Sequence, residues 1–133
     1  MSDILFERRG VAGVVTLNRP GALNAISHAM VHAFAEQLSA WETDPAVTRV
    51  VVTAAGGRAF CAGGDLRALY DLGRAGRYDE ALQYWRDEYR LNAAIGRFVK
   101  PYVALVDGLP MGGGVGIAFH GSHRVAYENA QFG

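Results

Sequence analysis

The sequence predicts an α/β fold in which strands are joined by helical crossovers, and three observations support this. Short apolar runs typical of buried strands alternate along the chain with longer segments of helical periodicity. Two of these runs lead into helices through glycine-rich loops. Glycine accounts for 17 of the 133 residues, which fits a fold with many close backbone turns. We expect a single domain that spans residues 1–133.

The N-terminal part predicts a hairpin followed by a helix. Two strand-like runs, Ile4–Arg8 and Val11–Leu17, flank Gly10. Ser27 is a suitable N-cap for the helix, which the turn residues 43–45 end. Apolar residues recur along this helix at three- and four-residue steps, namely Val31, Phe34, Leu38 and Trp41.

The rest of the chain predicts three further strands and a long helix. The strands are expected at residues 49–53, 102–106 and 123–127. Between the first two of them, an amphipathic helix is expected from about Asp79 to Val99, before Pro101. We expect four of its side chains to face inward, namely Leu82, Trp85, Tyr89 and Ile95.

Two glycine loops lie between a strand and a helix: the first glycine loop, residues 62–65, and the second glycine loop, residues 112–114. Without a Cβ, such a backbone lets its N–H groups approach a ligand at the positive end of the helix dipole. A phosphate-binding P-loop would need a lysine where Gly114 stands and a serine or threonine where Val115 stands. A dinucleotide site would need glycine at Ile117 or Phe119. Taken singly, the second loop is either a packing turn or an oxyanion site.

Together, the two loops favour the oxyanion site. One N–H from each loop can bind a single carbonyl oxygen and stabilise negative charge that develops there. A thioester fits this chemistry, because both its enolate and its tetrahedral intermediate carry charge on that oxygen.

The composition excludes several other classes of protein. Thirteen basic residues balance thirteen acidic ones, and no basic tract indicates nucleic acid or a membrane surface. A single cysteine, Cys61, excludes an internal disulfide and fits a reducing compartment. The first ten residues carry no signal-peptide hydrophobic region. We therefore expect a cytoplasmic protein.

Four segments then point to one family. They are Leu17–Ala25, Ala59–Asp65, Lys100–Gly116 and Ala130–Gly133, and in this order they resemble the crotonase (enoyl-CoA hydratase/isomerase) superfamily. The resemblance implies a spiral of ββα units that binds acyl-CoA thioesters, with coenzyme A as part of the substrate and no separate cofactor.

The resemblance also implies roles for individual residues. The oxyanion donors would be the backbone N–H groups of Gly64 and Gly113. Ala62, Asp65 and Glu88 would contact the substrate, although Asp65 is also a suitable N-cap for the helix that follows it. For Glu88, the alternative is a solvated carboxylate beside Arg86 and Arg90 on one helix.

Within the family, the residues favour one branch. Hydratases carry a glutamate two residues after the triple glycine to activate water, whereas this chain has Gly116 there. Trp85–Asn92 and Met111–Gly121 look like the 3-hydroxyisobutyryl-CoA hydrolase branch. This resemblance implies hydrolysis of a short 3-hydroxyacyl-CoA, a step of valine breakdown. The alternatives are an enoyl-CoA hydratase or isomerase, and a truncated homologue that binds CoA without turnover.

In that branch the catalytic glutamate follows the Phe-Gly pair that matches Phe132-Gly133, so the resemblance places the acid/base carboxylates beyond residue 133. We expect a spiral that is incomplete at its C-terminus. A missing C-terminal segment or a homo-oligomer would complete it.

Two further clusters invite a chemical interpretation that the sequence disfavours. Cys61 lies beside the first glycine loop, but no histidine is placed next to it, and a lone cysteine is usually a small hydrophobe. His28 and His32 are one helical turn apart but lack a third ligand nearby in the sequence. We therefore expect no metal.

Overall fold

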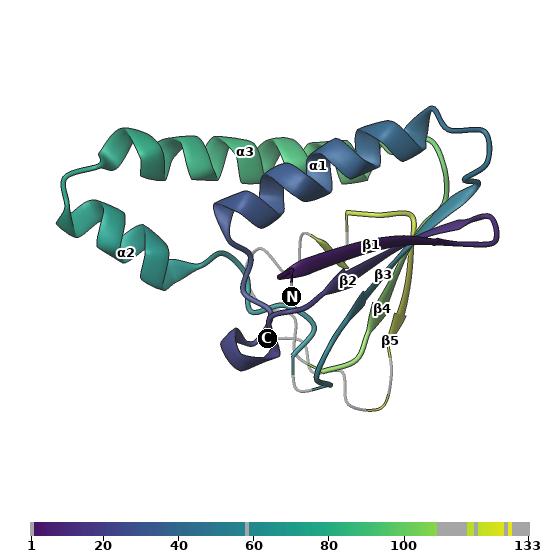
Figure 1. The fold of residues 1–133 in the computed structure, drawn as a ribbon, viewed down its shortest axis with the longest axis horizontal. Coiled ribbons are helices and arrows are strands. Elements are labelled where there is room, and N and C mark those ends of the chain that lie inside the picture. The colour runs from purple at the N-terminus through teal and green to yellow at the C-terminus, as the bar shows by residue number, and fades with distance from the viewer. Residues whose placement is uncertain (1, 58, 109–116, 119, 127, 129–133) are drawn as a thin grey trace.

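The computed structural model describes residues 2–57, 59–108, 117–118, 120–126 and 128. Within them, five strands form one sheet in the order β1-β2-β3-β4-β5 (Figure 1). The hairpin strands β1 (Ile4–Arg9) and β2 (Ala12–Leu17) are antiparallel. The remaining strands continue the sheet in parallel, namely β3 (Arg49–Ala54), β4 (Tyr102–Val106) and β5 (His123–Ala126). The predicted α/β class is confirmed.

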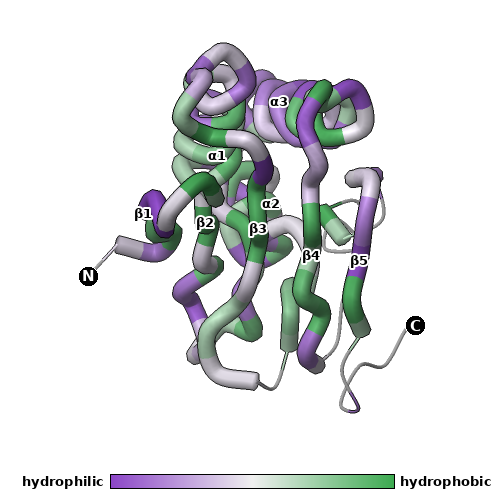
Figure 2. The backbone as a smooth tube through the Cα atoms, turned by 90° about the vertical axis from the view of Figure 1, so that its right-hand side faces the viewer, coloured by the Kyte–Doolittle hydropathy of each residue, from purple (hydrophilic) through white to green (hydrophobic). Residues whose placement is uncertain are grey.

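In the described residues, three α-helices lie between β2 and β4. They are α1 (His28–Glu42), α2 (Leu66–Arg74) and α3 (Tyr78–Arg97), and a short 3-10 turn, η1 (Pro20–Ala22), precedes α1. Helices α1 and α3 lie side by side on the same side of the sheet, and α2 extends away from it (Figures 1 and 2). No helix in the described part of the chain is long and apolar enough to cross a membrane.

The core forms where alternate residues of the sheet meet α1 and α3. In β4 and in residues 49–53 of β3, every second side chain is fully buried, while the intervening ones are half-buried or exposed. This period of two is expected for strands with one face in the core. The sheet contributes Val15, Leu17, Val50, Val52, Tyr102, Ala104 and Val106 to the core cluster, and the helices contribute Val31, Phe34, Leu38, Trp41, Leu91 and Ile95. The apolar face predicted for the first helix is confirmed.

The inward face predicted for α3 is wrong at three of its four positions. Leu82, Trp85 and Tyr89 are 45%, 44% and 70% exposed, and only Ile95 is buried. The side chains that face inward are instead Ala81, Tyr84, Leu91 and Ile95. Both sets follow helical spacing, so periodicity alone does not identify the buried one.

Candidate active site

The first glycine loop is held in place by a short parallel bridge between Gly64 and Ile26. The Ile26 N–H donates to the Gly63 carbonyl at 2.8 Å, and the Asp65 N–H donates to the Ile26 carbonyl at 3.0 Å. Because successive residues of an extended chain point their polar groups to opposite sides, the Gly64 N–H points away from Ile26. No residue in the described ranges accepts a hydrogen bond from it. A backbone donor without a partner among the described residues can bind a ligand oxygen.

Glu88 of α3 lies next to Gly64. A methyl group in place of the Gly64 hydrogen would lie 3.5 Å from Glu88 Oε2 and 3.0 Å from the Tyr84 hydroxyl oxygen. Glycine at this position thus leaves room between the loop and the helix. The structure brings together Gly64 and Glu88, two of the residues that the resemblance selected.

The environment of Glu88 disfavours the interpretation as an ordinary solvated carboxylate. Its side chain is half-buried, and no donor among the described residues forms a hydrogen bond or ion pair with it. Arg90, the expected solvent-side neighbour, pairs with Asp87 at 3.5 Å instead. Burial raises the pKa of Glu88 above its usual range. An unpaired carboxylate in such a place can accept a hydrogen bond from a ligand hydroxyl group.

Tyr84 is a site residue that sequence reasoning missed. Its hydroxyl group donates to the Ile26 carbonyl and accepts a hydrogen bond from the Asp65 N–H at 3.2 Å. Burial raises the pKa of Tyr84 to about 12, so it stays neutral. The side chain fixes the distance between the first glycine loop and α3. Its position one helical turn before Glu88 was the available signal, because residues four apart share a helix face.

Two residues of the Leu17–Ala25 segment hold the same loop in place through side-chain hydrogen bonds. The buried Asn24 side chain donates to the carbonyls of Ala55 and Ala59, each at 2.9 Å. Arg19 donates to Asp65 Oδ2 at 3.2 Å. This part of the family-like segment therefore holds the loop between β3 and α2, a role that the sequence pattern did not show.

The other predicted site residues have mixed outcomes. The Asp65 side chain caps α2 by accepting from the Ala68 N–H at 3.1 Å, as its N-cap interpretation predicts. Together with its ion pair to Arg19, this engages both carboxylate oxygens. The Ala62 N–H donates to the Leu23 carbonyl at 3.0 Å. Substrate contacts by Ala62 and Asp65 stay predictions, and Gly113 lies outside the described residues.

Cys61 is fully buried behind the loop. Burial raises the pKa of its thiol to about 12, which keeps the nucleophilic thiolate unpopulated near neutral pH. Its sulfur accepts a hydrogen bond from the Gly63 N–H at 3.4 Å. The structure thus agrees with the interpretation of Cys61 as a packed, unreactive side chain.

His28 and His32 lack a third possible ligand nearby in the sequence, but the fold brings one carboxylate to both of them. Asp87 comes from α3 to contact both rings, with its Oδ2 atom 2.7 Å from His28 Nε2 and 2.9 Å from His32 Nε2. No local spacing could reveal this contact, because the two histidines and the aspartate are more than fifty residues apart in the sequence.

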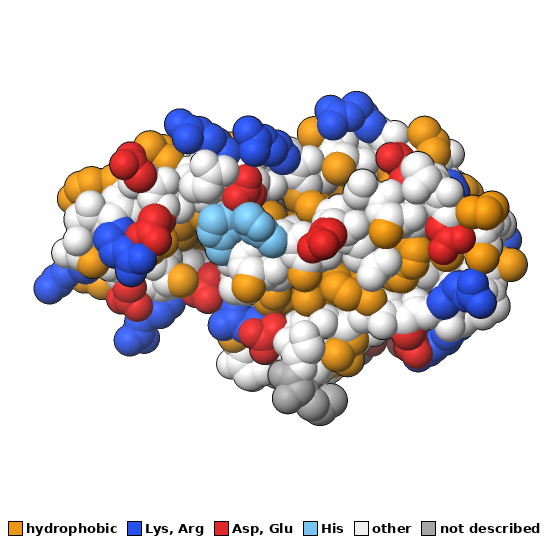
Figure 3. Space-filling model, turned by 45° about the horizontal axis from the view of Figure 1, so that its top comes forward, with side chains coloured by type: hydrophobic (Ala, Val, Ile, Leu, Met, Phe, Trp, Pro, Cys, Tyr) orange, Lys and Arg blue, Asp and Glu red, His pale blue; other side chains and the backbone are white. Residues whose placement is uncertain are grey.

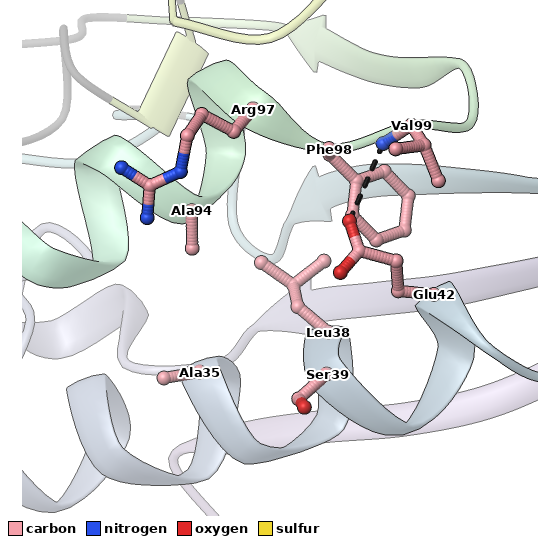
Figure 4. A pocket seen from close by; sticks show the side chains of 8 residues that line it. All are labelled: Ala35, Leu38, Ser39, Glu42, Ala94, Arg97, Phe98 and Val99. Carbon is pink, nitrogen blue, oxygen red and sulfur yellow. Dashed lines mark hydrogen bonds between the residues drawn. The ribbon is translucent and has the colours of Figure 1, made fainter.

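A separate pocket of about 410 Å³ lies between α1 and the C-terminal end of α3 (Figure 4). It is lined by Ala35, Leu38, Ser39, Glu42, Ala94, Arg97, Phe98 and Val99. The Val99 N–H donates to Glu42 Oε2 at 3.3 Å across its rim. None of the residues assigned to the candidate site lines this pocket, so we do not assign it to the acyl-CoA substrate.

Comparison with known proteins identifies the family of this chain. The family model described as enoyl-CoA hydratase/isomerase matches residues 12–133. Among curated proteins, the mitochondrial 3-hydroxyisobutyryl-CoA hydrolases of Xenopus tropicalis and Homo sapiens are 53% and 46% identical, each over 98% of this chain. The match covers 34% and 33% of those proteins, so this chain spans about a third of their length.

Solved structures agree in fold. An enoyl-CoA hydratase from Rhodobacter sphaeroides superposes with a TM-score of 0.95 at 46% identity, covering 98% of this chain and 39% of the other. A carnitinyl-CoA dehydratase from Mycobacterium thermoresistibile gives 0.93 at 46% identity, with 99% and 38% coverage. The expectation of a cytoplasmic location is contradicted, because the curated hydrolases are named as mitochondrial.

Proposed function

Because the chain belongs to the enoyl-CoA hydratase/isomerase family, we propose that it carries part of the active site of a hydrolase acting on short 3-hydroxyacyl-CoA thioesters of the 3-hydroxyisobutyryl type. One observation carries this proposal: Gly64, whose N–H has no acceptor among the described residues, lies beside the half-buried Glu88 carboxylate, which has no donor among them. The identity to curated hydrolases over almost the whole chain supports the same choice of substrate.

In the proposed reaction, water attacks the thioester carbonyl carbon and the carbon–sulfur bond breaks. The acid/base carboxylate that the resemblance places beyond residue 133 takes a proton from the water and passes it to the leaving coenzyme A thiolate. The Gly64 N–H binds the carbonyl oxygen, and the Gly113 N–H is the proposed second donor. Losing one such donor typically costs about 2.7–4 kcal/mol of transition-state stabilisation. Glu88 accepts a hydrogen bond from the 3-hydroxyl group of the substrate, which orients the acyl chain. The reaction needs no cofactor, since coenzyme A belongs to the substrate.

The second candidate is an enoyl-CoA hydratase, which the likeness to the Rhodobacter sphaeroides hydratase favours. The sequence argues against it at Gly116, where the hydratase branch uses a carboxylate to activate water.

An assay with two substrates distinguishes these candidates, provided that the protein assayed includes the segment beyond residue 133 where the resemblance places the acid/base carboxylates. We expect thiol release from 3-hydroxyisobutyryl-CoA and no change in crotonyl-CoA. Loss of the enoyl absorbance of crotonyl-CoA without thiol release would instead support the hydratase. Binding of the CoA ester with neither reaction would support a non-catalytic homologue.

A binding measurement then tests the role of Glu88. We expect Glu88→Gln to weaken binding of a thioether analogue of 3-hydroxyisobutyryl-CoA roughly tenfold, because an ionised acceptor adds about 1.5 kcal/mol to a hydrogen bond. The analogue that lacks the 3-hydroxyl group should bind both proteins alike. Glu80→Gln on the same helix is the matched control, since Glu80 is exposed and pairs with Arg77. Equal weakening of both analogues would refute the hydroxyl contact.

A further inference from the structure

We propose that His28, His32 and Asp87 form a binding site for a divalent transition-metal ion of the zinc type, which ties α1 to α3. Two imidazoles and a carboxylate are the protein ligands typical of such ions. The three ligand atoms lie within 4.8 Å of one another. Histidine side chains gather in one patch at the surface of the helical layer (Figure 3). This proposal does not depend on the proposed function.

The contacts among these three side chains converge on one point. His28 Nε2 and His32 Nε2 are 2.9 Å apart, and Asp87 Oδ2 is 2.7 Å from the first and 2.9 Å from the second. Each neutral ring has a lone pair on one nitrogen only. If both Nε2 atoms carry a proton and donate to the carboxylate, the contact between the two Nε2 atoms joins two donors and forms no hydrogen bond. If one Nε2 is unprotonated, it can accept from the other ring, but its own contact with the carboxylate oxygen then joins two acceptors and forms no hydrogen bond. Hydrogen bonds therefore satisfy at most two of the three contacts.

A metal ion resolves this conflict because all three atoms can present lone pairs to it. Zinc binds imidazole nitrogen at about 2.0–2.1 Å, and at tetrahedral angles its ligand atoms lie about 3.3 Å apart. The triangle observed here would have to open by only about half an ångström, which rotation of the partly exposed rings allows.

Asp87 is already held in a suitable orientation. Gln83 donates to its Oδ1 atom at 2.9 Å, and Arg90 lies 3.5 Å from the same oxygen, which leaves Oδ2 to face the histidines. Such outer contacts orient metal ligands. A cavity of about 150 Å³ beside His32 and Asp87 leaves room for a water molecule as a further ligand.

Metal binding would affect how α3 packs against α1. His28 is the first residue of α1, and Asp87 directly precedes Glu88 on α3. The His28 ring also packs edge-on against Tyr84, with 5.3 Å between the ring centroids. A bound ion would therefore stabilise the packing of α3 against α1 next to the candidate active site.

The test titrates Zn²⁺ into the full chain, prepared without a polyhistidine tag and freed of metal by a chelator. We expect calorimetry to show one ion bound per chain and the melting temperature to rise with Zn²⁺. Co²⁺ in its place should give visible d–d absorption bands. His32→Gln and Asp87→Asn should each weaken binding at least about tenfold, and Gln83→Ala about tenfold through the orientation of Asp87.

His123→Gln is the matched control, because His123 is an exposed histidine on β5, outside the cluster. It should bind Zn²⁺ as the unaltered protein does. Circular dichroism establishes that each variant is folded, and two ligand variants guard against the failure of one. Absence of Zn²⁺ binding, or binding that His32→Gln and Asp87→Asn leave unchanged, would overturn the proposal. A loss in His123→Gln equal to that in His32→Gln would overturn it as well.

Discussion

At the scale of single residues, Tyr84 connects the first glycine loop to the helix layer. Its hydroxyl group contacts Ile26, which precedes α1, and Asp65, which precedes α2. A side chain that bonds to both strands of the bridge holds the Gly64 backbone in position. The same helix face carries the Glu88 carboxylate, which no donor in the described part of the chain binds.

We expect Tyr84→Phe to lower the free energy of unfolding by about 0.5–1.5 kcal/mol. The loss should stay in this range because the Ile26 carbonyl keeps the Asp65 N–H as a donor. Urea denaturation measures it. Tyr89→Phe on the same helix is the control, since Tyr89 is 70% exposed, and we expect a change within about 0.5 kcal/mol. Equal effects of the two variants would contradict the role of the Tyr84 hydroxyl group.

At the scale of elements, Lys100 joins the start of β4 to the C-terminal end of α1. Its Nζ atom donates to the carbonyls of Trp41, Asp44 and Val47 at 2.5, 2.7 and 2.6 Å. A cation is favourable there because the helix dipole is negative at its C-terminus. Lys100 belongs to a segment that carries the family resemblance, and the structure gives it this structural role.

Replacing Lys100 with methionine should lower the free energy of unfolding by about 1.5–3 kcal/mol, because three carbonyls lose a charged donor. Lys100→Arg should also destabilise the fold, since a planar guanidinium cannot place three donors at the position of one ammonium group. Thermal unfolding measures both. Arg67→Met, an exposed change of the same charge on α2, is the control and should have little effect. An unchanged Lys100→Met protein would refute the bridging role.

At the scale of the whole molecule, stability depends on how closely the helix layer approaches the sheet. Trp41 of α1 lies over Gly13 of β2, and the ring of Phe6 on β1 packs edge-on against it at 6.1 Å between centroids. A methyl group at Gly13 would lie 2.7 Å from the Trp41 ring. Glycine here allows the contact between the layers.

We therefore expect Gly13→Ala to cost about 1–3 kcal/mol of stability and to change the fluorescence of Trp41. Chemical denaturation followed by tryptophan emission tests both effects. Gly21→Ala is the matched control, because nothing lies within 4 Å of a methyl group there and its φ is not positive. It should be neutral or slightly stabilising. If Gly13→Ala were as stable as the control, the helix layer could move away from the sheet without loss of stability, and the prediction would be wrong.

Local pattern in the sequence determined much of the architecture. The hairpin, the Ser27 cap, the apolar face of α1 and the positions of β3, β4 and β5 all follow from residues close together in the chain. Side-chain period and capping chemistry act over a few residues, so they can be read without the fold. The family resemblance added Gly64 and Glu88, which the structure places side by side.

Tertiary structure alone decided which face of α3 is buried, how Tyr84 meets Ile26, and that Asp87 meets His28 and His32. The physical reason is the same in each case. The two faces of α3 have similar apolar content, and only the position of α1 and the sheet selects one of them. Contacts between residues more than fifty positions apart depend on that packing and leave no local signal in the sequence.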